Sequence, residues 1–303
     1  MKIVFAGSPE YAVPSLKAVH EKYGVAAVIT QPDKPVGRKK VLTPTPVKVE
    51  AEKLGIPVYD FDKIRNRVEE VKALGADIMI TCAYGQLLTQ EVLDCFGKGV
   101  WNLHASLLPK FRGASPIQAA ILAGETHTGV TVMRTELSLD TGDILLVKRC
   151  EIGDKNCAEL SAVLSLLSAE AAVEAVGLID SGNIQLLMQD EAKATFCKKI
   201  QKSDCKIDFS HSAGDICRLI RAMNPEPYAF CEQNGLVLNI LRATATEGEG
   251  ETGTVICADK KGIVVKCGMG AILIEELQPA GGKIMKAADY VNGRKIKAGD
   301  KLD

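Results

Sequence analysis

One short stretch of the chain carries an amide and an imidazole at a spacing that places both on one face of a predicted strand. Asn102 and His104 lie two residues apart in the run Val100–His104, whose other members are good strand formers. Because side chains alternate across a strand, these two point to the same face. An amide can donate to a developing oxyanion, and an imidazole can move protons near neutral pH. Such a pair is either buried with its hydrogen bonds satisfied within the fold or part of a functional site.

A structured loop follows this strand and favours the second interpretation. Pro109, Gly113 and Pro116 break regular structure directly after it. Polar residues at the end of a strand, followed by a loop, suit an active site at the carboxyl edge of an α/β sheet. Downstream, Asp140 lies in Leu-Asp-Thr-Gly-Asp. This segment is also good turn chemistry, so Asp140 is either a catalytic carboxylate or a turn residue.

The elements that must position these residues alternate between strands and helices. Strands are expected over 2–6, 25–30, 77–82, 100–104, 128–133 and 144–151. Helices are expected after residue 10 and over 46–54, 62–74, 87–95, 115–123 and 158–178. This alternation predicts an α/β fold with a Rossmann-like, mostly parallel sheet.

The remainder of the chain changes character. A helix over 213–221 precedes short strand-like runs at 229–231, 236–241, 253–257, 262–267 and 271–277. Short strands with glycine-bearing turns predict a small β-barrel of the oligonucleotide-binding kind. We therefore expect a catalytic domain over 1–189, a polar linker over 190–206 and a C-terminal, OB-like domain over 207–303.

Composition narrows the function classes. A net charge of -1 over 303 residues excludes a uniformly basic nucleic-acid binder but permits local basic patches. The ten cysteines include no Cys-x-x-Cys pair and no ligand-like cluster with histidine, so we expect reduced thiols and no metal. Gly7 follows the first strand without a Gly-x-Gly-x-x-Gly motif, which argues against NAD or FAD. We expect no secretory signal and no membrane-spanning segment.

Two long motifs carry a family resemblance. Residues 102–116 read Asn-x-His-x-Ser-Leu-Leu-Pro-x-x-Arg-Gly-x-x-Pro, and residues 139–143 read Leu-Asp-Thr-Gly-Asp. Together they resemble the formyltransferase family that uses 10-formyltetrahydrofolate, and the resemblance extends over nearly the whole chain. It implies that Asn102, His104 and Asp140 are the catalytic residues. Two segments depart from the family pattern: residues 133–138 before Asp140, and Glu226 where an aromatic residue is usual.

The resemblance implies transfer of a formyl group to the methionine amine of initiator methionyl-tRNA, for translation initiation. Attack of the amine on the formyl carbon creates a tetrahedral oxyanion, to which Asn102 and His104 would donate. His104 would also move the proton from the amine towards the leaving folate nitrogen. Asp140 would hold the imidazole and favour its protonated form, or order a water that carries the proton. No metal is needed.

The resemblance also implies two binding regions. The folate site would be lined by Ser106, Leu107, Leu108, Pro109, Tyr84, Gly85, Gln86 and Leu87. The basic, proline-rich segment 31–46 would approach the tRNA through Arg38, Lys39 and Lys40. Without the family, that segment is a solvated loop, and the lysines of the linker and the C-terminal end, taken alone, are a solvated surface. Beside the basic segment 31–46, these lysines favour a track for an RNA backbone, so we expect the domain over 207–303 to bind the tRNA.

Three other functions remain open on sequence alone. The acceptor could be another amine, such as a sugar amine or glycinamide ribonucleotide. The chain could instead be a hydrolase that releases formate from the folate. A non-catalytic RNA-binding module would leave Asn102, His104 and Asp140 unexplained. We expect a cytoplasmic monomer that binds methionyl-tRNA and the folate and no membrane.

Overall fold

The computed structural model describes residues 1–37 and 39–303, which form two compact units. The first unit comprises Met1–Pro116, His127–Glu151 and Ser161–Cys197; the second comprises Ile117–Thr126, Ile152–Leu160 and Lys198–Asp303. The chain therefore passes between the units several times. The simpler division with a linker over 190–206 stays a prediction.

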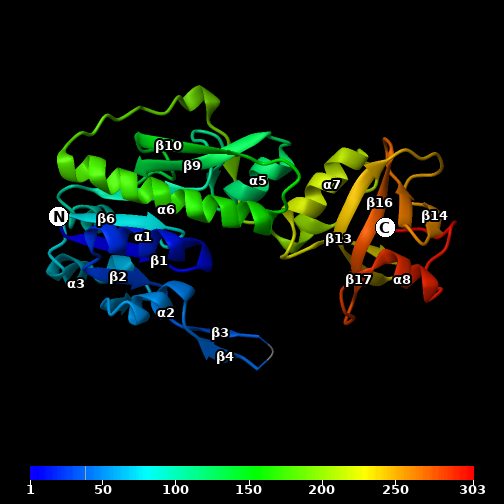
Figure 1. Ribbon diagram of the computed structural model, residues 1–303, viewed down its shortest axis with the longest axis horizontal. Helices are drawn as coiled ribbons and strands as arrows, with labels where there is room; N and C mark the ends of the chain where they lie inside the picture. The colour runs from blue at the N-terminus through cyan, green and yellow to red at the C-terminus, as the bar shows by residue number, and fades with distance from the viewer. Residues whose placement is uncertain (38) are drawn as a thin grey trace. The chain divides into compact units, whose positions relative to one another are not determined.

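A mixed sheet with strand order β10-β9-β7-β6-β1-β2-β5 is the centre of the first unit (Figure 1). Its strands are β1 (Ile3–Gly7), β2 (Ala27–Thr30), β5 (Val58–Asp60), β6 (Ile78–Cys82), β7 (Val100–His104), β9 (His127–Arg134) and β10 (Ile144–Glu151). From β5 to β7 the neighbouring strands are parallel, and β9 and β10 join them antiparallel. The predicted Rossmann-like sheet is confirmed, and β5 is a strand that the sequence analysis missed.

Helices cover both faces of this sheet because its central strands are apolar throughout. The helices are α1 (Val13–Tyr23), α2 (Pro46–Lys53), α3 (Val68–Ala73), α4 (Gln90–Leu93) and α6 (Cys157–Ser181). Every residue of β1 and β6 is buried. Val4 and Ala6 of β1 belong to one core cluster with Val71 of α3 and Val92 of α4. Helix α1 contacts α6, since the Tyr23 hydroxyl of α1 donates to the Val173 carbonyl of α6.

Three local expectations are wrong. The helix expected over 62–74 is interrupted at Arg67, whose φ of -126° separates a short 3-10 turn (Ile64–Asn66) from α3. The helix expected over 87–95 is reduced to α4. The irregular segment expected after β2 contains a hairpin of β3 (Lys34–Val36) and β4 (Val41–Thr43). Backbone hydrogen bonds of a hairpin are compatible with proline at an edge, which is why Pro35 does not prevent it.

Helix α6 corrects the expectation that no segment is long and apolar enough to span a membrane. It has 25 residues with a mean hydropathy of 1.8 over its most apolar window. Half of that window is buried in the structure, and a core helix passes the same test of length and composition. Leu164, Ala172 and Val176 are among its fully buried residues.

The second unit contains an antiparallel sheet with strand order β12-β13-β16-β15-β14, and β17 pairs with β16. Its elements are α7 (Ala213–Ala222), β12 (Ala229–Gln233), β13 (Leu236–Thr246), β14 (Val255–Asp259), β15 (Gly262–Lys266), β16 (Ala271–Pro279), β17 (Met285–Lys286) and α8 (Ala287–Asn292) (Figure 1). These strands fall where the short apolar runs predict them.

The last residues of the chain connect the two outer edges of this sheet. Asp303 exchanges backbone hydrogen bonds of 2.9 and 3.0 Å with Glu232 of β12. The amide of Leu302 donates to the carbonyl of Gly253, just before β14, at 2.8 Å. The C-terminal segment thus bridges the two edge strands, as in the predicted small barrel. All ten cysteines of the chain are free thiols.

Candidate active site

Asn102 lies on β7 in an orientation set by the neighbouring strand. The hydroxyl of Thr81, on β6, donates to Oδ1 of Asn102 at 2.8 Å. Thr81 and Asn102 are register partners in the parallel β6–β7 ladder. This bond fixes the orientation of the amide. Nδ2, which carries the two donor hydrogens, is then available to a ligand. Strand pairing therefore prepares a hydrogen-bond donor at half-buried Asn102.

His104 lies at the end of the same strand and is only 5 % exposed. Its Nε2 is 2.9 Å from the carbonyl oxygen of Phe111. A carbonyl only accepts, so Nε2 carries the proton in this bond. The other ring nitrogen, Nδ1, faces Oδ2 of Asp140 at 3.7 Å. The structure thus brings together the strand residue and the loop residue that the sequence analysis selected separately.

Two opposing effects act on the pKa of His104. Burial lowers the pKa because it penalises the charged imidazolium, and the Asp140 carboxylate raises it. Burial is the larger effect, so the pKa lies below the usual histidine value. Asp140 does raise the pKa of His104, as expected, but this effect is smaller than that of burial. At neutral pH the imidazole is therefore neutral, with its lone pair on Nδ1.

Asp140 is held in the loop between β9 and β10. Its φ of 53° lies in the left-handed region, which aspartate tolerates better than most residues. Oδ2 accepts a hydrogen bond from the backbone amide of Gly113 at 2.8 Å. The carboxylate thus links its loop to Gly113, 27 residues earlier in the chain, and is also a neighbour of His104.

Gly113 is the residue that this contact requires. It lies in β8 (Arg112–Gly113), which pairs in parallel with β11 (Phe196–Cys197). Its φ is +123°, and a Cβ at this position would lie 2.0 Å from the carbonyl oxygen of Cys197. Only glycine fits between β11 and the carboxylate of Asp140.

The predicted folate-lining run 106–109 follows His104 and is held in place by two hydrogen bonds of the Thr131 hydroxyl, from β9. The Thr131 hydroxyl donates to the Ser106 carbonyl at 2.7 Å and accepts from the Leu108 amide at 3.1 Å. Ser106 is fully buried, and its hydroxyl donates to the Lys110 carbonyl at 2.6 Å. Leu107 and Pro109 are only partly buried, so they are the apolar residues of this run available to a ligand, whereas Leu108 is buried.

The second predicted folate segment follows β6 and contains residues with different environments. Tyr84 is 4 % exposed and its hydroxyl has no hydrogen-bond partner in the described part of the chain, whereas Leu87 is 76 % exposed. The Gln86 side chain accepts from the Ile64 amide and donates to the Phe61 carbonyl. Gly85 has a φ of +77°, and a Cβ there would lie 2.7 Å from Nε2 of Gln31. Gln86 therefore shapes the turn, and Leu87 presents an apolar side chain to solvent.

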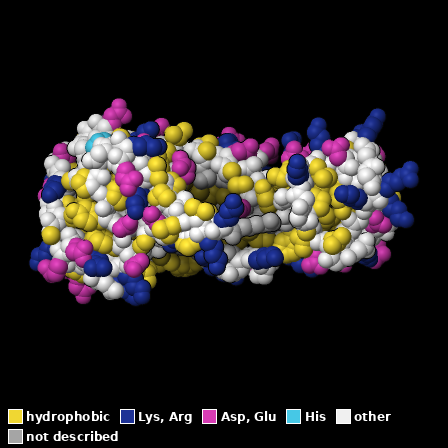
Figure 2. All heavy atoms as spheres, turned by 90° about the horizontal axis from the view of Figure 1, so that it is seen from below, with side chains coloured by type: hydrophobic (Ala, Val, Ile, Leu, Met, Phe, Trp, Pro, Cys, Tyr) yellow, Lys and Arg dark blue, Asp and Glu magenta, His cyan; other side chains and the backbone are white. Residues whose placement is uncertain are grey.

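Two of the predicted tRNA-contacting residues, Lys39 and Lys40, lie exposed in the turn between β3 and β4. The third, Arg38, lies outside the described residues. Val41 and Leu42 are also exposed, at 58 % and 64 %. Figure 2, seen from the side on which the hairpin lies, shows Lys and Arg side chains beside apolar ones.

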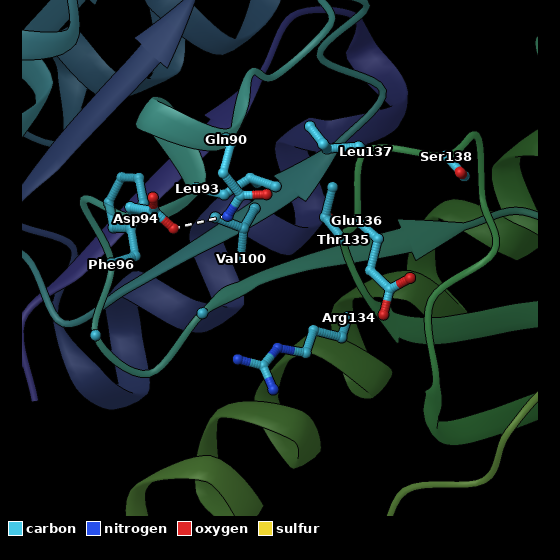
Figure 3. Close-up of a pocket in the computed structure, with 12 residues that line it drawn as sticks. Gln90, Leu93, Asp94, Phe96, Val100, Arg134, Thr135, Glu136, Leu137 and Ser138 are labelled. Atoms are coloured by element: carbon cyan, nitrogen blue, oxygen red, sulfur yellow. Dashed lines mark hydrogen bonds between the residues drawn. The ribbon is translucent and has the colours of Figure 1, made fainter.

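A hollow of about 600 Å³ lies at the other end of β7 and is distinct from this site (Figure 3). Val100, at the start of β7, and Arg134, at the end of antiparallel β9, both line it. With about 3.3 Å per residue along a strand, Val100 is roughly 13 Å from His104. Figure 3 shows the Gln90–Asp94 hydrogen bond on one side of the hollow and Arg134 on the other.

Sequence reasoning missed several residues that build the site. Thr81 and Thr131 are buried polar residues within β6 and β9. A polar residue within an otherwise apolar strand is the sequence signal that could have identified them. Gln189 contacts the Asp140 loop from 49 residues away, at the end of an irregular segment. No local pattern signals such a contact. In residues 1–37 and 39–303, no group of three or more His, Cys, Asp or Glu is arranged to hold a metal ion.

Comparison with known families agrees with this architecture. The formyl transferase model matches residues 1–175, and the model of the formyl transferase C-terminal domain matches residues 199–295. A methionyl-tRNA formyltransferase from Coxiella burnetii is 42% identical over 308 residues, covering 100% of this chain and 97% of its own. One from Neisseria meningitidis is 43% identical and covers 100% of both chains.

A solved structure supports the fold. An N-formyltransferase from Helicobacter canadensis, determined with folinic acid and dTDP-3-aminofucose, superposes with a TM-score of 0.70 over 90% of this chain and 99% of its own. At 20% sequence identity this likeness concerns the fold alone. With both domain models and full-length relatives matched, the chain belongs to the formyl transferases, in the family of the methionyl-tRNA formyltransferases.

Proposed function

We propose that this chain transfers the formyl group of 10-formyltetrahydrofolate to the methionine amine of initiator methionyl-tRNA. The observation that carries the proposal is the match at 42–43% identity along the whole chain, C-terminal unit included, to methionyl-tRNA formyltransferases. The arrangement of Asn102, His104 and Asp140 supplies chemistry suited to that reaction. The folate is a co-substrate, and the proposed reaction needs no metal.

Asn102 stabilises the charge that develops during attack. When the amine nitrogen bonds to the formyl carbon, the formyl oxygen becomes an oxyanion. Nδ2 of Asn102 donates to that oxygen, because the hydrogen bond from Thr81 to Oδ1 fixes the orientation of the amide. Such a donor is worth about 3 kcal/mol in a dry site.

His104 moves the proton. Burial keeps its imidazole neutral at physiological pH, so Nδ1 can accept the proton that the attacking amine loses. Asp140, 3.7 Å from Nδ1, stabilises the imidazolium that then forms. The same proton passes to the folate nitrogen as its bond to the formyl carbon breaks, which returns His104 to its neutral form. The Nε2 bond to the Phe111 carbonyl keeps the ring oriented throughout.

The two predicted folate segments divide their work between side chains and main chain. Leu107 and Leu87 supply apolar contact area, since neither is fully buried in the protein. Leu108 and Pro109 complete the wall of the loop. Gly85 allows close approach of the backbone, and Tyr84, Gln86 and Ser106 hold the turns in place. This division gives a site in which main-chain groups fix orientation and leucines supply affinity.

The β3–β4 hairpin contributes to tRNA binding. Lys39 and Lys40 are exposed in the turn, and the sequence of this segment carries three consecutive cations, Arg38, Lys39 and Lys40. Phosphate contacts need such reachable cations, and they position the nucleic acid without reading its sequence. The exposed Val41 and Leu42 beside them suit contact with bases or sugars.

The experiment that tests the proposed function compares acceptors. Formyl transfer from 10-formyltetrahydrofolate is measured with charged initiator tRNA, uncharged tRNA, glycinamide ribonucleotide, a sugar amine and water. We expect transfer to the charged tRNA alone at appreciable rate. Faster transfer to a small amine would contradict the assignment of the acceptor. Release of formate without any acceptor would indicate a hydrolase.

A further inference from the structure

Gln189 connects the two segments that hold the catalytic carboxylate, although it lies far from both in sequence. Its side chain is 5 % exposed, and it precedes the short 3-10 turn Glu191–Lys193. We propose that Gln189 is a positioning residue for Asp140. This inference rests on the proposed function, because its catalytic consequence acts through His104.

The amide of Gln189 uses its complete hydrogen-bonding capacity. Nε2 donates to the backbone carbonyls of Asp140 at 2.9 Å and Gly142 at 2.8 Å. Oε1 accepts from the Arg112 guanidinium, at 3.1 Å from Nε and 2.8 Å from Nη2. A primary amide has two donor hydrogens and two acceptor lone pairs, so every one is satisfied. The orientation is therefore fixed, since a flip would place Oε1 against two carbonyl oxygens.

These bonds close a ring of contacts around Asp140. Gln189 holds the Asp140 backbone, and the Gly113 amide holds the Asp140 carboxylate at 2.8 Å. Gly113 is the chain neighbour of Arg112, to which Gln189 is bonded. Asp140 is thus fixed at its main chain and its side chain by one connected unit. Moving any member of the ring moves the carboxylate relative to His104.

Arg112 gives this ring its rigidity. Its side chain is 1 % exposed, and its charge is balanced by Glu191, with hydrogen bonds of 2.6 and 2.9 Å. Paired hydrogen bonds between a guanidinium and a carboxylate are among the strongest in proteins. Oε1 of Gln189 accepts from the other edge of the same guanidinium, formed by Nε and Nη2. The amide is therefore held by a fixed buried group and can in turn fix the loop.

Asp140 needs an external clamp because its backbone is in the left-handed region. A non-glycine residue with a φ of 53° carries backbone strain, less for aspartate than for most residues, and keeps this conformation only where its surroundings hold it. The two carbonyls on either side of Thr141 are the groups that Gln189 binds. Without these bonds the loop can relax, and the carboxylate leaves its place 3.7 Å from Nδ1.

The test uses two substitutions of Gln189 in the full-length enzyme. Gln189→Met keeps the approximate volume, removes the bonds and adds no charge. Gln189→Glu keeps the acceptor for Arg112 and replaces the donors by an oxygen. We expect each to lower kcat for methionyl-tRNA by about 10- to 100-fold, the loss that follows a displacement of about 1 Å. The KM values for both substrates should stay within about twofold.

A second readout does not depend on turnover. The pKa of His104 is followed by NMR of the imidazole signals, with the His104→Gln variant identifying its signal among the four histidines. Asp140 raises this pKa, so displacement of the carboxylate in Gln189→Met should lower it. Gln233→Met is the matched control. Gln233 is also 5 % exposed and donates to a backbone carbonyl, that of Lys295, in the second unit. That variant should leave the His104 pKa unchanged.

The outcomes separate the two proposals. A folded Gln189→Met or Gln189→Glu enzyme with wild-type kcat, and with the His104 pKa of Gln189→Met unchanged, overturns the positioning role. A fall in melting temperature alone overturns it as well, because Gln189 would then be merely structural. If the wild-type protein formylates no tRNA, the proposed function fails, whereas the His104 pKa still tests the contact between Gln189 and the Asp140 loop.

Discussion

The Nδ1 of His104 and Oδ2 of Asp140 face each other at 3.7 Å, just beyond the range of a direct hydrogen bond. Each is fixed by a different partner, His104 by the Phe111 carbonyl and Asp140 by the Gly113 amide. The pair is therefore held near contact while Nδ1 stays free to take a proton. This separation is the geometry expected of a base whose protonated form is stabilised by a carboxylate.

Replacing Asp140 by asparagine removes the charge and keeps an oxygen for the Gly113 amide. We expect kcat to fall by about 100-fold, because the imidazolium loses its stabilising carboxylate. The KM for 10-formyltetrahydrofolate should change by less than about twofold. The pKa of His104, measured by NMR, should fall further, since the carboxylate raises it. An unchanged kcat accompanied by lower stability would make Asp140 a turn residue.

The buried His104 also makes stability depend on pH. Its folded-state pKa is lowered, mainly by burial, so the unfolded chain binds a proton more readily at mildly acidic pH. The stability it contributes is complete above the usual histidine pKa of about 6.5 and is lost as pH falls through the folded-state pKa. Urea unfolding at several pH values should show a steeper acidic loss in the wild type than in His104→Gln. Equal slopes in the two proteins would contradict the lowered pKa.

Gly113→Ala should disrupt the support of Asp140 by steric collision. The new Cβ would lie 2.0 Å from the Cys197 carbonyl oxygen, at a φ of +123°. We expect a loss of about 3 kcal/mol or more in the free energy of unfolding, together with a fall in kcat. Gly182→Ala is the matched control, since Gly182 has a φ of +72° and nothing within 4 Å of the added carbon. It should cost about 1 kcal/mol and leave kcat in place.

Replacing Arg38, Lys39 and Lys40 together by alanine should weaken tRNA binding selectively. We expect the KM for methionyl-tRNA to rise by about 10-fold. The slope of log KM against log salt concentration should decrease by about two, as the loss of three phosphate contacts predicts. The folate KM should hardly change. A Lys72→Ala, Lys98→Ala variant removes exposed lysines from α3 and from the loop before β7 and serves as control. An identical salt dependence in all proteins would leave the hairpin without a role in binding.

Much of the fold follows from periodicity. The central strands of the first unit are buried on both faces and read as short apolar runs, and the alternation along β7 places Asn102 and His104 together without further information. The hairpin after β2 was missed because prolines and lysines conceal its short strands. The helix expected over 62–74 failed because the Gln86 side chain binds the Ile64 amide and stabilises a turn there, which is a long-range contact.

The site itself was only partly predictable. Asp140 is selected by its motif, but its approach to His104 depends on the pairing of β7 with β9 and on the Gly113 contact. Gln189 lies in a polar segment expected at the boundary of a linker, and its partners are 77 and 49 residues away. Hydrogen bonds over such separations are formed by the tertiary structure, and no local propensity encodes them.

The central claim is that the Asn102–His104–Asp140 site formylates methionyl-tRNA. It is tested most directly by single-turnover formyl transfer to charged initiator tRNA, in the wild type and in Asn102→Ala, at saturating concentrations of both substrates. We predict rapid transfer by the wild type and a rate lowered by about 100- to 1,000-fold in the folded variant, as expected for loss of an oxyanion donor. Equal rates in the two proteins, or no transfer to the tRNA by the wild type, would contradict the account.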